Sequence, residues 1–199
     1  METFQAFEAA RDAFDARLRE VKSGQWKLGT PCPDWDVRAL VNHVIGGNVR
    51  YVMLLHGAGL EEINASRSMD HAGDDPVAAF RHSAAELQSA FEEPGALSRR
   101  VQHPGGELSG ADLLGARIID YAAHGWDLAR AIGGDERLDE ELIAYLLTST
   151  PLLERLEWGR ARGYFAQPPQ IPSDASAQAR WLNLTGRVMD QPQKSLRET

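Results

Sequence analysis

The chain has 199 residues, of which 43% are hydrophobic and 25% are charged, with a net charge of −8. This length and composition predict one globular domain large enough to enclose a sizeable core. Lysines and arginines are scattered singly or in pairs. The sequence therefore has neither the basic stripe of a nucleic-acid-binding surface nor the polybasic run of a membrane-binding surface.

Signals for secretion and membrane insertion are missing from the sequence. The single cysteine, Cys32, excludes an internal disulfide and gives no indication of an oxidising compartment. The first residues, METFQAFEAARDAF, are amphipathic and lack the apolar core of a signal peptide. Since no stretch approaches the roughly 20 apolar residues that cross a bilayer, we expect a soluble, cytoplasmic protein.

Helical periodicity dominates the first half of the chain. Apolar residues recur at spacings of three and four from Phe4 to Leu18, which predicts a helix that fades near residues 23–24. After a loop rich in glycine and proline, Asp36 is expected to cap a second helix that runs to about residue 55. Residues 61–75 are predicted to be a polar loop. A third helix should then begin at Pro76 and end before residues 94–95.

The second half continues the helical pattern after one extended excursion. Residues 97–108 predict a short hairpin around a Pro-Gly-Gly turn, and Ser109 should cap a fourth helix that ends at residues 133–134. A fifth helix is expected over about residues 139–160, interrupted or kinked at Pro151. A short helix at 176–188 and a frayed polar end complete the chain. The predicted fold class is all-α: one domain over residues 1–199, with a bundle over about 1–160 and a C-terminal extension over about 161–199.

Two of the six histidines, His43 and His124, lie in mid-helix among apolar neighbours. Each must hydrogen-bond or bind something, because an unsatisfied buried polar group costs about 1–3 kcal/mol. Asp120 lies four residues before His124, so both side chains share one helix face, about 5–6 Å apart at Cβ. Such a pair can occupy two positions of a tetrahedron around Zn²⁺, and His43 is the best third ligand from a facing helix. Since this spacing also arises by chance, a pair of satisfied core histidines remains the alternative.

Several neighbours of these residues allow two interpretations. Gly47, one turn beyond His43, either opens a pocket beside the metal or permits close helix packing, and the same holds for Gly46 and Gly125. Asp127 either orients an imidazole or pairs with an arginine such as Arg130, and we expect the structural role.

The remaining polar and aromatic candidates are expected to be structural. Cys32 is predicted to be a buried or loop cysteine and not a reactive thiol, and Trp35 and Trp126 are predicted to be core anchors. The other four histidines are expected at the surface: His56, His71, His82 and His103.

Three stretches resemble one known superfamily: TPCPDWDVRALVNHVIGGN (residues 30–48), HGWDLARAIG (124–133) and YFAQPPQIPSDASAQARWLNLTGR (164–187). They are similar to the DinB-like and mycothiol-dependent maleylpyruvate isomerase superfamily, and most of all to its short actinobacterial metal-binding branch. The resemblance implies an up-down-down-up four-helix bundle with a divalent metal between helices. The family ligands fall on His43, Asp120 and His124. The isomerase has glutamate where this chain has Asp120, a side chain shorter by one methylene.

The resemblance also implies a chemistry. It predicts a mycothiol-type thiol-dependent isomerase or S-transferase acting on a small electrophile, with the metal as Lewis acid and mycothiol as co-substrate. Zinc is the expected metal, and nickel, iron or manganese would suit the same donors. The isomerase carries an additional C-terminal domain, whereas only about 30–40 residues follow the predicted bundle here, so we do not expect maleylpyruvate itself to be the substrate. The alternative is a non-catalytic metal-binding or small-ligand-binding accessory protein. A homodimer is compatible with either of these two functions.

Overall fold

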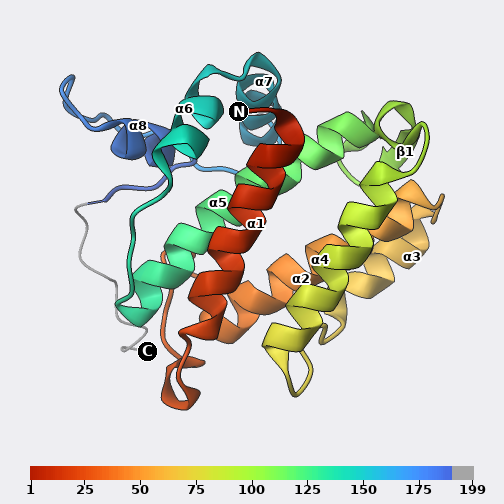
Figure 1. The fold of residues 1–199 in the computed structure, drawn as a ribbon, viewed down its shortest axis with the longest axis horizontal. Helices are drawn as coiled ribbons and strands as arrows, with labels where there is room; N and C mark the ends of the chain where they lie inside the picture. The colour runs from red at the N-terminus through yellow and green to blue at the C-terminus, as the bar shows by residue number, and fades with distance from the viewer. Residues whose placement is uncertain (190–199) are drawn as a thin grey trace.

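The computed structural model describes residues 1–189. Four long helices form a bundle (Figure 1): α1 (Thr3–Arg19), α2 (Val37–Leu55), α4 (Pro76–Glu92) and α5 (Gly110–Ile132). Helix α1 packs along α5, α2 packs along α4, and α2 also contacts α5. The predicted fold, a mainly α-helical DinB-like bundle, is confirmed. Residues 190–199, where the sequence predicts a frayed end, lie outside the described residues.

Three of the four bundle helices begin at capping residues, and two of these, Asp36 and Ser109, were predicted. Asp36, Asp75 and Ser109 each accept a hydrogen bond from the backbone N–H three residues later, at 2.8–3.1 Å. Each cap satisfies one of the donors that the first turn of a helix leaves free. At its other end α5 stops at Gly133, whose φ of +70° is favourable for glycine. The long α5 is therefore fixed at both ends, and it is the helix that carries the candidate site.

A short hairpin joins α4 to α5, as the sequence predicts. A 3₁₀ turn, η3 (Ala96–Ser98), leads into strands β1 (Arg100–His103) and β2 (Gly106–Ser109), which pair in antiparallel fashion. The hairpin lies at one end of the bundle (Figure 1), and β1 contacts α2. This contact brings His103 to the C-terminal half of α2, where its ring centroid is 6.3 Å from that of Tyr51.

The segment between α2 and α4 is more ordered than predicted. It contains helix α3 (Leu60–Ala65) and a 3₁₀ turn, η2 (Ser66–Ser68), where a polar loop was expected. The helix is stabilised by Glu62, whose carboxylate accepts the Gly59 N–H at 3.0 Å, and by Ile63, which is buried in the core. Helix α3 has only six residues, of which Leu60, Ile63 and Ala65 are apolar, and so short a run gives no clear helical periodicity in the sequence.

In the C-terminal part, the predicted interruption of the fifth helix near Pro151 is confirmed, whereas the last helix is shorter than predicted. The predicted fifth helix is divided at residue 149 into α6 (Glu140–Thr148) and α7 (Thr150–Arg160), with Pro151 in the first turn of α7. Proline has no N–H to continue the α6 ladder but is favourable at the start of a helix. Helix α8 (Ala177–Leu184) ends earlier than expected because Gly186 adopts a φ of +80°. A 3₁₀ turn, η1 (Ser23–Gln25), precedes the loop before α2.

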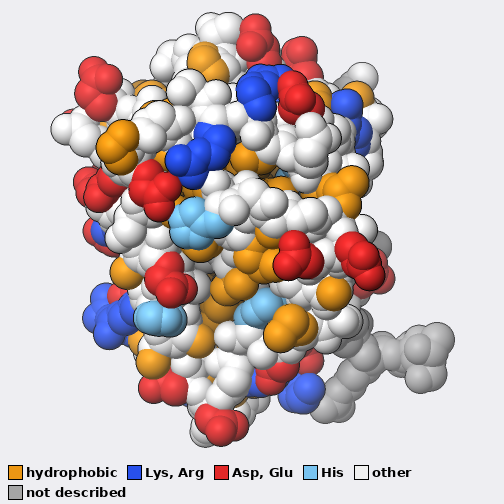
Figure 2. Space-filling model, turned by 90° about the vertical axis from the view of Figure 1, so that its right-hand side faces the viewer, with side chains coloured by type: hydrophobic (Ala, Val, Ile, Leu, Met, Phe, Trp, Pro, Cys, Tyr) orange, Lys and Arg blue, Asp and Glu red, His pale blue; other side chains and the backbone are white. Residues whose placement is uncertain are grey.

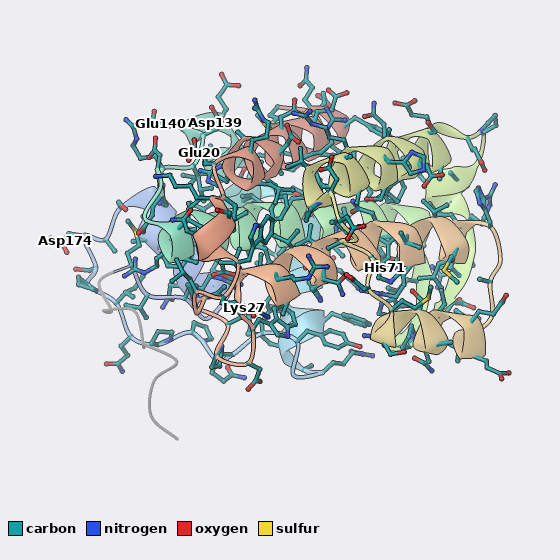
Figure 3. All side chains as sticks on the ribbon, turned by 90° about the horizontal axis from the view of Figure 1, so that it is seen from below. Glu20, Lys27, His71, Asp139, Glu140 and Asp174 are labelled. Carbon is teal, nitrogen blue, oxygen red and sulfur yellow. The ribbon has the colours of Figure 1, made fainter. Side chains whose placement is uncertain are left out.

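Charge is distributed over the outside of the bundle. Basic and acidic side chains are interspersed on the face shown in Figure 2. Among the labelled acidic residues, Asp139 and Glu140 lie at the start of α6 and Glu20 directly follows α1 (Figure 3). Among the described residues, no helix has the length and apolar character needed to span a membrane.

Candidate metal centre and its cavity

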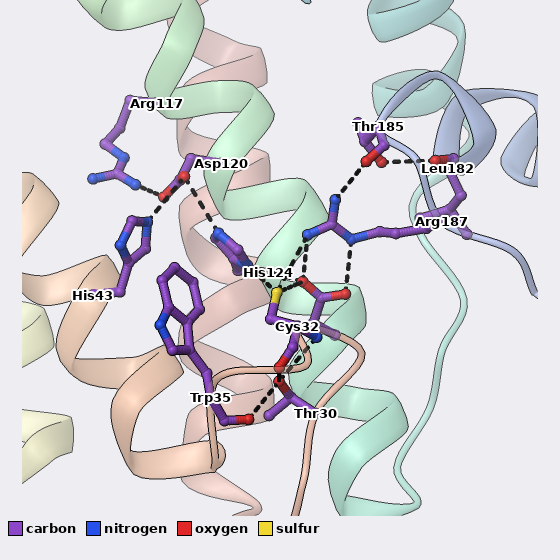
Figure 4. Close-up of polar contacts among 11 residues, drawn as sticks. Thr30, Cys32, Trp35, His43, Arg117, Asp120, His124, Leu182, Thr185 and Arg187 are labelled. Atoms are coloured by element: carbon purple, nitrogen blue, oxygen red, sulfur yellow. Dashed lines mark hydrogen bonds and ion pairs between the residues drawn. The ribbon is translucent and has the colours of Figure 1, made fainter. Parts of the chain in front are cut away.

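The three predicted ligands meet between α2 and α5 (Figure 4). The Nε2 atoms of His43 and His124 each lie 3.5 Å from Oδ1 of Asp120. One ligand atom from each of the three residues lies within 4.8 Å of the other two. The two imidazole centroids are 5.1 Å apart. The i, i+4 spacing on α5 therefore brings Asp120 and His124 to one face, as predicted, and α2 supplies the third nitrogen.

A second layer of charges holds the α5 ligands in place. Oδ2 of Asp120 forms an ion pair with Arg117, whose guanidinium also donates to the Val44 carbonyl at 3.4 Å. This arrangement leaves Oδ1 facing the two imidazoles. Gly47 makes room for it, because a Cβ at this position would collide with the Arg117 guanidinium. Gly47 lines the cavity, but the space left by its missing side chain is occupied by the Arg117 guanidinium of α5, so it permits close packing between the two helices.

Asp127 orients the imidazole of His124. Its Oδ2 accepts a hydrogen bond from Nδ1 of His124 at 2.9 Å, so the neutral ring presents an unprotonated Nε2 toward Asp120. Arg187 donates to both oxygens of Asp127, at 2.7 Å from Nε and 2.5 Å from Nη2. The arginine partner of Asp127 is thus Arg187, from the segment after α8, while Arg130 forms an ion pair with Glu136.

The pKa values follow from burial and these contacts. Burial lowers the pKa of His43 well below its usual value, and the nearby His124 and Arg117 lower it further. For His124, burial opposes the charged form, but the hydrogen bonds with Asp127 and Cys32 outweigh it and raise the pKa. Burial would also raise the pKa of Asp127, yet the charge of Arg187 and its hydrogen bonds hold it well below the usual range. Asp127 is therefore a carboxylate at neutral pH.

The loop before α2 closes one side of the site. The ring of Trp35 lies over His43, with centroids 4.4 Å apart, and 5.7 Å from that of His124. Trp35 is half-buried and packs against the core at the edge of the site, whereas Trp126 is fully buried in the core. Sγ of Cys32 lies 3.5 Å from Oδ2 of Asp127 and 4.0 Å from Nδ1 of His124. The thiol is therefore beside the outer nitrogen of His124, on the opposite side of the ring from Asp120.

The site opens into a cavity of about 660 Å³. Its wall is made by α2, α5, α7, the hairpin, the Cys32 loop and the chain around Arg187. The volume is within the range of small-molecule sites, roughly 300–1,000 Å³. His103 lines this cavity and is half-buried, and His71 is half-buried with Nε2 2.8 Å from the Ser66 carbonyl oxygen. The prediction of surface positions is therefore wrong for these two histidines, while His56 and His82 are exposed.

The donor set fits a divalent metal. Two imidazole nitrogens and one carboxylate oxygen form a three-ligand set typical of catalytic zinc sites, which keep a fourth position for water or substrate. A second group, Cys32, His124 and Asp127, also brings three potential ligands together. In this second group, however, both oxygens of Asp127 accept hydrogen bonds from Arg187, and Oδ2 also accepts one from Nδ1 of His124. The group of His43, Asp120 and His124 is therefore the better candidate.

Fold and site together define a mainly α-helical bundle with a two-histidine, one-carboxylate cluster beside a small-molecule cavity. Residues 7–129 match the family model described as the mycothiol maleylpyruvate isomerase N-terminal domain, and the chain belongs to this family.

Two relatives and one solved structure are similar to this chain. The uncharacterized protein Rv0738 of Mycobacterium tuberculosis is 33% identical over 157 residues, covering 77% of this chain and 80% of that protein. A second uncharacterized protein of the same organism, Rv0036c, is 27% identical over 139 residues, covering 63% of this chain and 54% of its own length. The crystal structure of the mycothiol-dependent maleylpyruvate isomerase matches with a TM-score of 0.56 at 17% identity, covering 78% of this chain and 68% of that one. At this identity the structural match establishes the fold alone.

Proposed function

We propose that His43, Asp120 and His124 bind one divalent metal ion, with zinc as the first candidate. On this basis the protein is a thiol-dependent isomerase or S-transferase that acts on a small electrophile. The observation that carries the proposal is the convergence of three ligand atoms within 4.8 Å of one another on the wall of a 660 Å³ cavity. A three-ligand set with space beside it suits catalysis better than a purely structural site, which normally has four protein ligands.

When bound, the metal would supply Lewis acidity and lower the pKa of a coordinated thiol, so that thiolate forms at neutral pH. The chain's own residues prepare the site for this. Arg117 holds Oδ2 of Asp120 and so turns Oδ1 toward the imidazoles. Asp127 keeps the Nδ1 proton on His124 and leaves Nε2 as the coordinating atom. Trp35 covers the His43 ring and excludes water from that side.

The identity of the thiol is supported by the relatives. The solved isomerase that shares this fold is described as mycothiol-dependent. The family model that spans residues 7–129 carries the same thiol in its description. We therefore propose mycothiol as co-substrate, with the cavity holding a small electrophile next to the thiol. Maleylpyruvate is the substrate of the solved relative, and this chain's own electrophile belongs to the further inference below.

The enzymatic part of the proposal is tested by turnover. The metal-loaded protein is incubated with mycothiol and a panel of conjugated cis-enones and alkyl halides. Isomerisation changes the absorbance of the enone at constant thiol concentration, whereas S-transfer consumes one thiol per product. We expect activity that His124→Ala removes and His82→Ala retains, since His82 is an exposed residue on α4. If no pair turns over faster than with His124→Ala, the enzymatic assignment is wrong.

A second candidate function is a small-ligand-binding accessory protein that works without a metal. The observation that favours it is the ion pair between Arg117 and Asp120, which already gives the carboxylate a counter-charge. In that case the protein binds no metal at stoichiometric level, and His43→Ala leaves the affinity for a cavity ligand unchanged.

A further inference from the structure

The cavity is strongly basic although the chain is acidic. Its described lining includes five arginines, Arg50, Arg67, Arg117, Arg155 and Arg187, but only two acidic residues, Asp34 and Asp120. The whole chain has a net charge of −8. Positive charge is therefore concentrated in the cavity although the chain as a whole is negatively charged. A cleft lined by one sign of charge attracts ligands of the opposite sign.

Two of the five arginines have close carboxylate partners, and the other three have donors left for a ligand. Arg117 pairs with Asp120 and Arg187 pairs with Asp127. Within residues 1–189, the guanidinium groups of Arg50 and Arg67 form no hydrogen bond and no ion pair. Arg155 forms only a long ion pair, 3.7 Å from Asp112. These three arginines come from separate elements: Arg50 from α2, Arg67 from η2 and Arg155 from α7.

Arg155 is held in place without using most of its donors. Its guanidinium carbon lies 4.1 Å from the centroid of the Trp158 ring, and Arg162 lies at the same distance from that ring. Its nearest carboxylate, on Asp112, is 3.7 Å away. Nε and Nη1 of Arg155 are buried and have no hydrogen-bond partner. Buried donors of this kind are rare in proteins and call for an explanation, and a bound anion supplies one.

Apart from the long ion pair between Arg155 and Asp112, the charges that act on this group of residues are mostly positive. Burial, followed by repulsion from Arg67 and Arg117, lowers the pKa of Arg50 to about 10. His103 lies among the same charges. Burial and then Arg67, Arg155 and Arg50 lower its pKa to about 4. Like charges held together in a partly buried space are costly unless an opposite charge binds between them.

Helix geometry relates this region to the metal centre. Arg50 follows His43 by seven residues on α2, which is about two turns and about 10 Å along the helix on nearly the same face. Gly47 lies between them and admits the Arg117 guanidinium. The candidate metal centre and the three arginines thus lie along one cavity, at a separation that one small molecule can span.

We propose that Arg50, Arg67 and Arg155 form an anion-binding subsite that holds a carboxylate or phosphate group of the cavity's ligand. The electrophile is then a small organic anion, whose charged end is bound by the arginines while its reactive end faces His43 and His124. Binding of the anion depends only on the arginines. Its role in a reaction rests on the proposed function.

The subsite is tested by titration calorimetry of the full-length protein at low ionic strength, with inorganic phosphate and with succinate as probes. We expect saturable binding of at least one probe at one equivalent. Arg50→Gln and Arg67→Gln should each weaken this binding about 10-fold or more, since a hydrogen bond to a charged group contributes on the order of a factor of ten in affinity. Binding of succinate alone identifies a carboxylate site, and binding of phosphate alone identifies a phosphate site.

Arg81→Gln is the matched control, since Arg81 is an exposed residue of α4 that pairs with Asp15 and its loss changes net charge by the same amount. Arg67 is exposed, so its variant should fold even if one of the others does not. His43→Ala distinguishes the anion-binding subsite from the proposed metal site, because this variant should lose the metal but still bind the anion. The subsite is refuted if neither probe binds saturably, or if Arg50→Gln and Arg67→Gln bind the probe as tightly as Arg81→Gln.

Discussion

The substitution Asp127→Asn tests most directly whether the hydrogen bonds of Asp127 to His124 and Arg187 stabilise the candidate metal centre. The side chain of Asp127 is 0% exposed and accepts hydrogen bonds from Arg187 at 2.7 and 2.5 Å and from His124 at 2.9 Å. Asparagine has nearly the same shape but no charge, and its NH₂ group cannot accept a hydrogen bond. The change therefore leaves the Arg187 guanidinium, 11% exposed, without its counter-charge.

Two effects of this change can be given a magnitude. Removing one partner of a buried ion pair costs about 3–5 kcal/mol, and we expect the lower end because the Asn oxygen can still accept one hydrogen bond from Arg187. With a urea m-value of about 2 kcal/mol/M, the midpoint of unfolding should fall by roughly 1.5 M. Loss of the carboxylate behind a ligating histidine typically weakens metal binding about 10–100-fold, so the dissociation constant for zinc should rise by that factor.

Urea unfolding of the metal-free protein at pH 7 measures the first effect, and competition with a chelator of known affinity measures the second. Asp135→Asn is the control, because Asp135 also pairs with an arginine, Arg137, but at the surface. Its unfolding midpoint should match the wild type. The pKa of Asp127 is depressed in the folded state, so its contribution is present at neutral pH and lost as the pH falls below about 4. An unchanged midpoint and an unchanged zinc affinity in Asp127→Asn would refute the reasoning.

Other positions give independent predictions. Tyr121→Phe removes the donor that lies 2.6 Å from Oδ1 of the buried Asn48 and should lower the free energy of unfolding by about 1–3 kcal/mol in urea titrations. Gly47→Ala should displace Arg117 and weaken zinc binding, measured by chelator competition, while circular dichroism shows the helices intact. Because the pKa of His103 falls to about 4 on folding, stability should decline as the pH drops from about 6.5 to 4, and His103→Gln should flatten that part of the pH profile of unfolding. An unaltered pH profile in this variant would show that His103 does not titrate as described.

Local sequence signals predicted most of the bundle. Apolar periodicity and capping residues indicated α1, α2, α4 and α5, and the turn at residues 104–106 indicated the hairpin. The pairing of Asp120 with His124 followed from helix geometry alone, since both lie on α5. These features depend on residues close in sequence, where spacing determines which side chains share a face.

Contacts between distant segments could not be predicted in the same way. Asp127 was expected to have an arginine partner, but Arg187 lies 60 positions further on, and only the path of the chain after α8 brings it there. Cys32 and Trp35 belong to a loop without periodicity, so neither could be placed against His124 in advance.

The basic wall of the cavity was missed for a similar reason. Arg50, Arg67 and Arg155 come from α2, η2 and α7, and nothing in the spacing of the sequence indicates that they share one cavity.

The most direct test of the central claim is the metal content of the untagged protein, measured by elemental analysis beside its His43→Ala, His124→Ala and His82→Ala variants. We predict about one equivalent of a divalent metal in the wild type and in His82→Ala, whose substituted residue lies on the outside of α4. Both His43→Ala and His124→Ala should lose it. Stoichiometric metal retained by either of these two variants, or no metal in the wild type after reconstitution with zinc, would contradict the claim that His43, Asp120 and His124 form the site.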